Sequence, residues 1–251
     1  MFPLYYKDYG SGSPALLLLH GLGVNGAAWD AVVKGLADWP GRIIVPDFRG
    51  HGRSPHTRHY SLAHHAADIA ELVEPGENIH VVGHSMGGAV GLILGSGMFG
   101  VTVAKLTTFG TKTNFTDDEL ARIAKVVNAP ARWFDTRDAA VERFLLVAGL
   151  TGLAAADSPV VNAGLVEEGG RWRLAADNAA SRVAGPPDLV DLVKLCRAPF
   201  RLGCGSNDPA VTIDALRVYD PEVVVFDGCA HSAHVEAPDQ VIALIRERHF
   251  G

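Results

Sequence analysis

Cysteine is scarce in this 251-residue chain, which contains only Cys196, Cys204 and Cys229. An odd and small number of cysteines argues against a disulfide framework and is typical of free thiols in a reducing compartment. The first residues also lack a basic region followed by an apolar one, so we predict no secretory signal. These absences make the cytoplasm the expected location.

Positive charge is the second scarce feature, since 22 lysines and arginines face 28 acidic residues and the formal net charge is −6. Nucleic acids and anionic membrane surfaces are bound by clustered Lys and Arg, so we expect neither as a partner. Residues 86–104 carry no charge and could cross a bilayer. However, their glycines and β-branched residues predict a helix over 86–98 and a buried strand over 101–109 instead. We therefore expect no membrane span.

Hydrophobic residues are plentiful, at 48% of the chain, and so are glycines, at 28. Apolar runs alternate with helical patterns, which predicts an α/β fold with a mostly parallel sheet and helices on both faces. Residues 4–9 and 15–19 are expected to form an opening hairpin. Residues 111–185 interrupt the alternation and predict several short helices with no clear strand. This insertion and the hairpin count against an eightfold α/β barrel.

The sharpest local motif is Gly-His-Ser-Met-Gly at residues 83–87, placed directly after an apolar strand and before a helix. This is the context of a nucleophile elbow, in which a tight turn exposes the serine hydroxyl above the sheet. The turn leaves no room for side chains at Gly83 and Gly87. The following helix supplies free N–H groups and a positive dipole end. We predict that Ser85 is a nucleophile.

A serine nucleophile requires a base and an acid that orients the base. His231 follows the predicted strand 223–226, and Asp208 follows the predicted strand 200–202. Ligand sites in open α/β sheets lie beyond the carboxyl ends of the strands, where both residues are expected. The order Ser85, Asp208, His231 is the one this type of site uses.

Four motifs resemble the α/β-hydrolase superfamily, and the resemblance covers nearly all of the chain outside 111–185. The nucleophile motif is one. The others are HGLG at residues 20–23, DFRGHGRS at 47–54 and AHSAHVEAP at 230–238. The resemblance implies that His231 is the base, with His234 as the alternative. It also implies an oxyanion hole formed by the backbone N–H groups of Leu22 and Met86.

Two other carboxylates compete with Asp208 for the acid role. Asp214 is expected on a helix and Asp227 in a turn. Some relatives place the acid after the strand that ends here at Phe109, but residues 111–113 contain no carboxylate. Asp208 is therefore the preferred acid.

The resemblance also identifies the insertion as a helical cap over Ser85. The predicted domains are a core of residues 1–110 and 186–251 and a cap of residues 111–185. The candidate substrate-binding residues are His20, His84, Trp133 and Phe134. Several arginines of the insertion could bind a substrate carboxylate, but most are expected to be solvated.

Two alternative ligand sites receive less support. The glycines of residues 47–54 suggest a phosphate loop, but the Gly-Lys-Ser/Thr ending is missing. Five histidines between residues 51 and 65 suggest a zinc site, but no cysteine lies nearby, and a solvated polar loop and helix start is the preferred interpretation. We predict no metal and no organic cofactor.

The leading functional hypothesis is a serine hydrolase that cleaves small to medium carboxylic esters or lactones through an acyl-enzyme. One alternative keeps the three residues for C–C bond hydrolysis or an elimination of the menaquinone-pathway type. Ser232 counts against it, because C–C hydrolases of the family often have an aromatic residue after the histidine. A second alternative is a receptor that binds a ligand without turnover. The expected partner is a small-molecule acyl substrate, and the sequence does not determine the oligomeric state.

Overall fold

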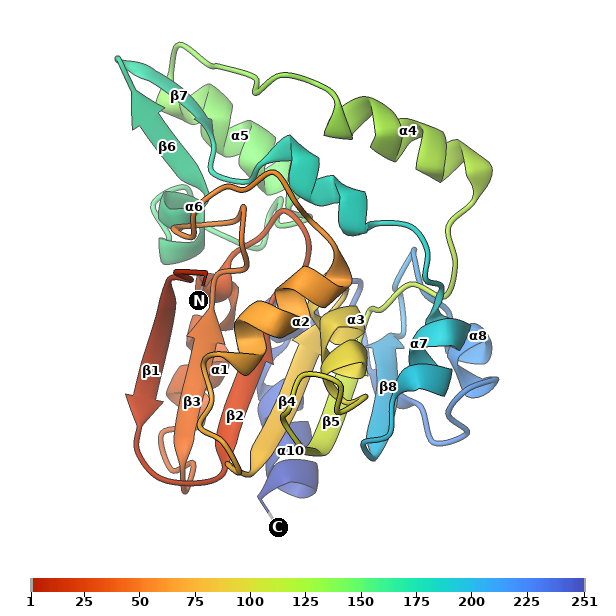
Figure 1. Cartoon of the computed structure of the whole chain (residues 1–251). Helices are drawn as coiled ribbons and strands as arrows, with labels where there is room; N and C mark the ends of the chain where they lie inside the picture. Colours follow the sequence, from red (N-terminus) through yellow and green to blue (C-terminus); the bar gives the residue numbers. More distant parts are fainter. Residues whose placement is uncertain (1, 251) are drawn as a thin grey trace.

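The computed structural model describes residues 2–250 and is built on a seven-stranded sheet (Figure 1). The strand order is β1-β3-β2-β4-β5-β8-β9, and every neighbouring pair except β1 and β3 is parallel. The strands are β1 (Tyr6–Gly10), β2 (Ala15–Leu19), β3 (Arg42–Pro46), β4 (Ile79–His84), β5 (Val103–Phe109), β8 (Phe200–Gly205) and β9 (Val224–Phe226). The predicted mostly parallel α/β fold is confirmed.

The centre of the sheet is apolar on both faces, as parallel sheets require. All five residues of β2 are fully buried, and β2 pairs with β3 on one edge and with β4 on the other. Each fully buried leucine of this strand stabilises the fold by about 1.5–3 kcal/mol relative to an exposed one. The rigid centre formed in this way carries the loops at the strand ends.

The predicted opening hairpin is wrong. β1 pairs antiparallel with β3, with Tyr6 opposite Pro46 and Gly10 opposite Arg42. β3 and β4 already occupy both edges of β2, so β2 has no free edge for β1. β1 therefore forms the antiparallel edge strand of the sheet.

Helices cover both faces of the sheet (Figure 1). One apolar cluster lies under α2 (Leu62–Ala70), α3 (Met86–Leu94), α7 (Leu189–Leu195) and α8 (Ile213–Arg217). The other lies under η1 (Gly26–Trp29), α1 (Asp30–Gly35), α9 (Ala233–Glu236) and α10 (Pro238–His249). Residues 86–104 thus divide into a helix and the start of a strand, and no helix within residues 2–250 is long and apolar enough to cross a membrane.

The insertion, residues 111–185, lies above the carboxyl ends of the strands (Figure 1). It contains α4 (Asp117–Val127), α5 (Arg137–Val147), α6 (Pro159–Ala163), β6 (Leu165–Glu168), β7 (Arg171–Leu174) and η2 (Asn178–Val183). The prediction that it lacks strands is wrong, because β6 and β7 form an antiparallel hairpin. The dipeptide Gly169-Gly170 is a sequence signal for a two-residue hairpin turn. In the structure its φ angles are 59° and 78°, as such a turn requires.

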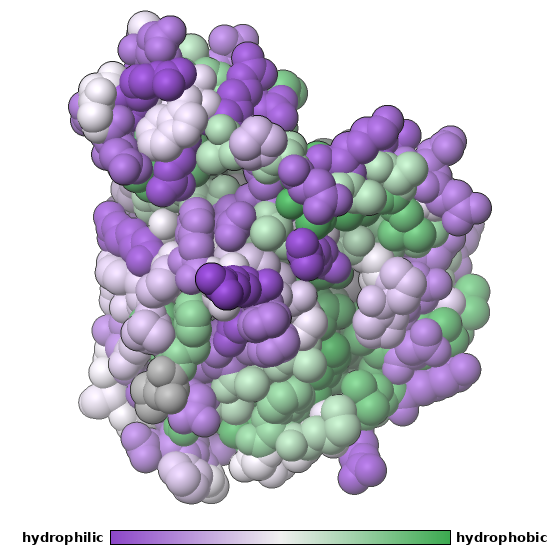
Figure 2. All heavy atoms as spheres, turned by 45° about the horizontal axis from the view of Figure 1, so that its top comes forward, coloured by the Kyte–Doolittle hydropathy of each residue, from purple (hydrophilic) through white to green (hydrophobic). Residues whose placement is uncertain are grey.

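The insertion contributes its own apolar cluster, which includes Phe134, Phe144 and Leu150 and packs on Val24 and Ala28 of the core. The tip of its hairpin is charged and exposed and forms a hydrophilic projection of the surface (Figure 2). Leu146 and Leu153, by contrast, are 64% and 44% exposed. Part of the insertion therefore packs on the core, and part leaves apolar side chains at the surface.

Candidate active site

Ser85 occupies the turn between β4 and α3 in a strained conformation, with φ 52° and ψ −116°. It is the single non-glycine residue with positive φ among residues 2–250. Its N–H donates to the Phe109 carbonyl at 2.8 Å, and the Thr111 hydroxyl donates to its carbonyl at 3.1 Å. Strain of this kind persists only where the surroundings enforce it, and it is frequent at functional sites.

The turn depends on the absence of side chains at its flanking positions. A Cβ atom at Gly87 would lie 2.3 Å from the Leu19 carbonyl oxygen, and one at Gly83 would lie 2.5 Å from the Gly87 carbonyl oxygen. Both contacts involve backbone, which cannot move aside without disturbing the sheet. These distances agree with the prediction that the turn has no room for larger residues here.

The structure brings His231 and Asp208 together. His231 Nδ1 lies 3.0 Å from Asp208 Oδ2, and the other carboxylate oxygen accepts the N–H groups of Ala210 and Val211 at 2.8 and 3.2 Å. Burial alone would raise the pKa of Asp208, but the hydrogen bonds and the nearby His231 outweigh it and lower this pKa below its usual value. Asp208 is therefore an ionised acceptor that keeps the proton of His231 on Nδ1.

Glu236, which was assigned no role from sequence, and His84, a predicted substrate-binding residue, both hold the loop around His231. The Glu236 carboxylate accepts the N–H groups of Ala230 at 2.6 Å and Ser232 at 2.7 Å, on either side of His231. His84 Nε2 lies 3.0 Å from the His231 carbonyl, to which it donates. Glu236 lies within the 230–238 motif, so its position was available in the sequence but its contacts were not.

Ser85, His231, Leu22 and Met86 line one cavity of about 180 Å³. Within residues 2–250, neither the Leu22 nor the Met86 backbone N–H has a hydrogen-bond partner. In the same residues, no hydrogen bond joins Ser85 Oγ to His231. Such serine–histidine bonds are often long in unliganded enzymes and tighten with substrate. The cavity thus combines a hydroxyl, an imidazole and two available N–H donors.

The other candidate residues occupy different positions. His20 is fully buried, where Nε2 accepts the Phe48 N–H at 3.0 Å and Nδ1 donates to the Gly21 carbonyl at 2.7 Å. His234, the alternative base, is buried in ring contact with Trp29 and His84. Neither residue lines the cavity of Ser85, and neither does His84.

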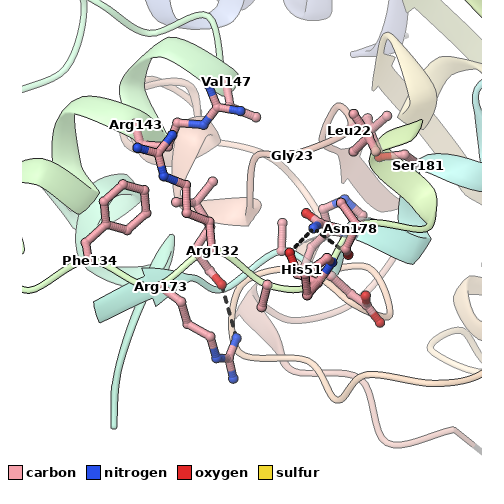
Figure 3. A pocket seen from close by; sticks show the side chains of 17 residues that line it. Leu22, Gly23, His51, Arg132, Phe134, Arg143, Val147, Arg173, Asn178 and Ser181 are labelled. Atoms are coloured by element: carbon pink, nitrogen blue, oxygen red, sulfur yellow. Dashed lines mark hydrogen bonds between the residues drawn. The ribbon is translucent and has the colours of Figure 1, made fainter. Parts of the chain in front are cut away.

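A second cavity, of about 490 Å³, lies between the insertion and the core loops (Figure 3). Phe134 lines it, whereas the predicted substrate-binding residue Trp133 does not and instead has the guanidinium groups of Arg171 and Arg173 over its ring. Leu22 lines both this cavity and that of Ser85. The loop that carries one of the available N–H groups therefore borders both cavities.

The histidines between residues 51 and 65 are not all solvated as predicted, because His51 and His65 are fully buried. Their rings pack with Phe48 and His20 beneath the Leu22 loop. Among residues 2–250, no group of three or more His, Cys, Asp or Glu side chains is placed to hold a metal ion. These two histidines are part of the packing below the site.

The buried histidines predict that the protein loses stability in mild acid. Their folded pKa values lie below the unfolded value of about 6.5, so the unfolded chain binds more protons as the pH falls below that value. Each histidine then removes up to about 1.4 kcal/mol of stability per pH unit. Burial lowers the pKa to about 4 for His20 and His80, and to about 3 for His51, His234 and His249.

Guanidinium denaturation at pH 7.5, 6.0 and 5.0 measures this effect. We expect the free energy of unfolding to fall steadily over this range. His234→Phe should reduce the slope, because phenylalanine binds no proton, and within residues 2–250 both ring nitrogens of His234 lack hydrogen-bond partners that the substitution would remove. The exposed His59 provides the matched control, His59→Phe. Equal stability at pH 7.5 and 5.0 would show that the histidines are not held neutral.

The sequence is similar to a known family and to characterised proteins along nearly its whole length. Residues 16–244 match the model of the alpha/beta hydrolase family. The chain is 29% identical over 266 residues to lipase LipV of Mycobacterium tuberculosis, covering 98% of this chain and 97% of that one. It is 28% identical over 253 residues to a pimeloyl-[acyl-carrier protein] methyl ester esterase of Aeromonas hydrophila, covering 97% of each.

Solved structures show the same architecture. E-2-(acetamidomethylene)succinate hydrolase superposes with a TM-score of 0.82 at 24% identity, over 98% of this chain and 94% of that one. At this identity the similarity concerns the fold. Together with the family match over residues 16–244, it shows that this protein belongs to the alpha/beta hydrolase family.

Proposed function

We propose that this protein is a serine hydrolase that cleaves small to medium carboxylic esters or lactones through an acyl-enzyme on Ser85. One observation carries the proposal: the strained Ser85 shares a cavity with His231, whose Nδ1 is held by the buried Asp208. The names of the relatives, a lipase and a methyl ester esterase, support ester chemistry.

The contacts support a specific sequence of steps. Asp208 keeps the His231 proton on Nδ1, so Nε2 is free to take the Ser85 proton as Oγ attacks the ester carbonyl. The Leu22 and Met86 N–H groups would stabilise the negative oxygen that forms. His231 then returns the proton to the leaving alcohol, and the alcohol departs. Water, activated by the same imidazole, attacks the acyl-enzyme and releases the acid.

Residues 111–185 are proposed to act as a cap over this site. Phe115, Val183 and Gly185 line the cavity of Ser85 together with core residues. The lining is mainly apolar, which suits an uncharged ester group beside the nucleophile. The proposed cap therefore excludes water from the reacting atoms and sets the size of the substrate.

A fluorophosphonate probe tests the proposal on the intact protein. The probe should form one covalent adduct, located on Ser85 by peptide mass spectrometry, with parallel loss of hydrolysis of 4-nitrophenyl acetate and butyrate. Ser96→Ala provides a matched control, because Ser96 is buried and lies outside the cavity of Ser85. Unfolded protein should not react. Ester hydrolysis that persists in fully probe-treated protein, or an adduct on another serine, would contradict the proposal.

A further inference from the structure

The larger cavity carries an excess of positive charge at its wall. Arg132, Arg143 and Arg173 line it, against the single carboxylate of Asp177. That carboxylate is occupied, because it accepts the Tyr60 hydroxyl at 2.7 Å and the Ala179 N–H at 3.0 Å. The cavity therefore contains guanidinium groups that its own carboxylate does not neutralise.

Arg132 and Arg143 lie together on one side of this cavity (Figure 3). Both residues are exposed, and within residues 2–250 neither guanidinium group forms an ion pair or a hydrogen bond. The Arg132 guanidinium packs over the Phe134 ring, with Cζ 4.9 Å from the ring centroid, inside the range of about 6 Å in which a cation and an aromatic face attract each other. Two neighbouring guanidinium groups without an acidic partner form a site for an anion, which arginine binds through paired N–H donors.

The remaining charged groups near the cavities are engaged. Arg173 donates to the Leu174 carbonyl at 3.1 Å and its guanidinium packs over Trp133. Lys112, which lines the smaller cavity, pairs with Glu119 at 2.8 Å. Among the described residues that line the two cavities, Arg132 and Arg143 are thus the lysine or arginine residues whose side-chain nitrogens form neither a hydrogen bond nor an ion pair.

Hydrogen bonds hold one part of the cavity wall in place. The Asn178 side chain donates to the carbonyls of Ala129 and Pro130 at 3.1 and 3.2 Å, which ties the loop before Arg132 to η2. His51, fully buried, forms part of the lining on the core side. A preformed wall lowers the entropy cost of holding a ligand.

The position of His231 indicates which arm of an ester would enter this cavity. The leaving alcohol must lie beside His231, which protonates it, and His231 lines only the smaller cavity. The acyl arm would then extend past Leu22, the residue that lines both cavities, toward Arg132 and Arg143. Val126 and Val147 line the larger cavity and supply apolar contacts for a chain.

We propose that the substrates are esters whose acyl chain ends in a carboxylate, and that Arg132 and Arg143 bind this carboxylate. This inference rests on the proposed function, because it assumes that Ser85 is acylated. It narrows the substrate class to monoesters of dicarboxylic acids. The apolar walls would contact the chain, while the two guanidinium groups would set its length and select its charged end.

Paired substrates test the proposal in the full-length protein. Mono-4-nitrophenyl esters of adipic, suberic and sebacic acid are compared with 4-nitrophenyl esters of the neutral acids of equal chain length. We expect kcat/KM to favour the charged ester by about tenfold or more for at least one length. In the double variant Arg132→Gln/Arg143→Gln this ratio should fall by a similar factor, mainly through KM. Added sodium chloride should lower the ratio in the unmodified protein.

Arg171→Gln is the matched control, since Arg171 is exposed on the same insertion but does not line the cavity. It should leave the ratio unchanged. Equal kcat/KM for charged and neutral esters at every length, or a ratio that the double variant and salt leave unaltered, would overturn the inference. Ser85→Ala separates the two proposals: Ser85-dependent hydrolysis without charge preference rejects only the inference, whereas Ser85-independent hydrolysis rejects the proposed function.

Discussion

Replacing Ser85 with alanine is expected to lower kcat for 4-nitrophenyl butyrate by about 10⁴- to 10⁶-fold, because it removes the hydroxyl proposed to form the acyl-enzyme. The residual rate would come from the oxyanion donors and from substrate binding. The fold should be retained, since the hydrogen bonds that hold position 85 involve its backbone, to Phe109 and from Thr111. Steady-state kinetics and a thermal melt of the same preparation measure both effects.

Ser96→Ala is the control for this variant, because it removes a buried hydroxyl at a distance from the site. Its kcat should remain within about twofold of the original, as is usual for substitutions away from functional features. If Ser85→Ala keeps its melting temperature and more than a tenth of its activity, Ser85 is not the nucleophile.

Asp208→Asn is expected to lower kcat by about 10⁴-fold, the effect known for this change in a serine protease. The amide has no negative charge to stabilise the imidazolium, and its NH2 group can donate to Nδ1 and shift the His231 proton to Nε2. The Asn oxygen can still accept the Ala210 and Val211 N–H groups that Asp208 now accepts. We therefore expect loss of kcat with a folded protein and with KM little changed.

Two further carboxylates provide matched controls for Asp208. Asp214 lies on α8 with its side chain 91% exposed, and Asp227 is an exposed residue just after β9. Asp214→Asn and Asp227→Asn should each retain activity within about twofold. A large loss in either control, combined with an active Asp208→Asn variant, would move the acid role to that residue.

The local motifs of the site could be predicted because they depend on short-range chemistry. The tight turn at Ser85 requires glycines at positions 83 and 87, and both lie within the five consecutive residues 83–87. Asp208 and His231 could be proposed because each follows a strand that ends at the same edge of the sheet. Their 3.0 Å contact, however, is a property of the folded sheet.

Long-range pairing accounts for the parts that the sequence did not predict. β1 was expected beside β2, but β2 is paired on both edges, so β1 joins β3. The burial of His51 and His65 depends on Phe48 and on the loop above them, and not on any local pattern. The contacts of Glu236 with Ala230 and Ser232 are local, spanning six and four residues, but they form only when α9 turns back on the loop.

The sequence alone determined that the chain has an α/β fold, that it has a serine turn between a strand and a helix, and that an acid and a histidine follow later strands. Periodicity and turn chemistry act over a few residues, which is why these features are visible without coordinates. Tertiary structure decided which strands pair and which histidines are buried. It also decided that Arg132 and Arg143, which are 11 residues apart, lie beside one cavity. These outcomes depend on packing between distant segments, which no local pattern contains.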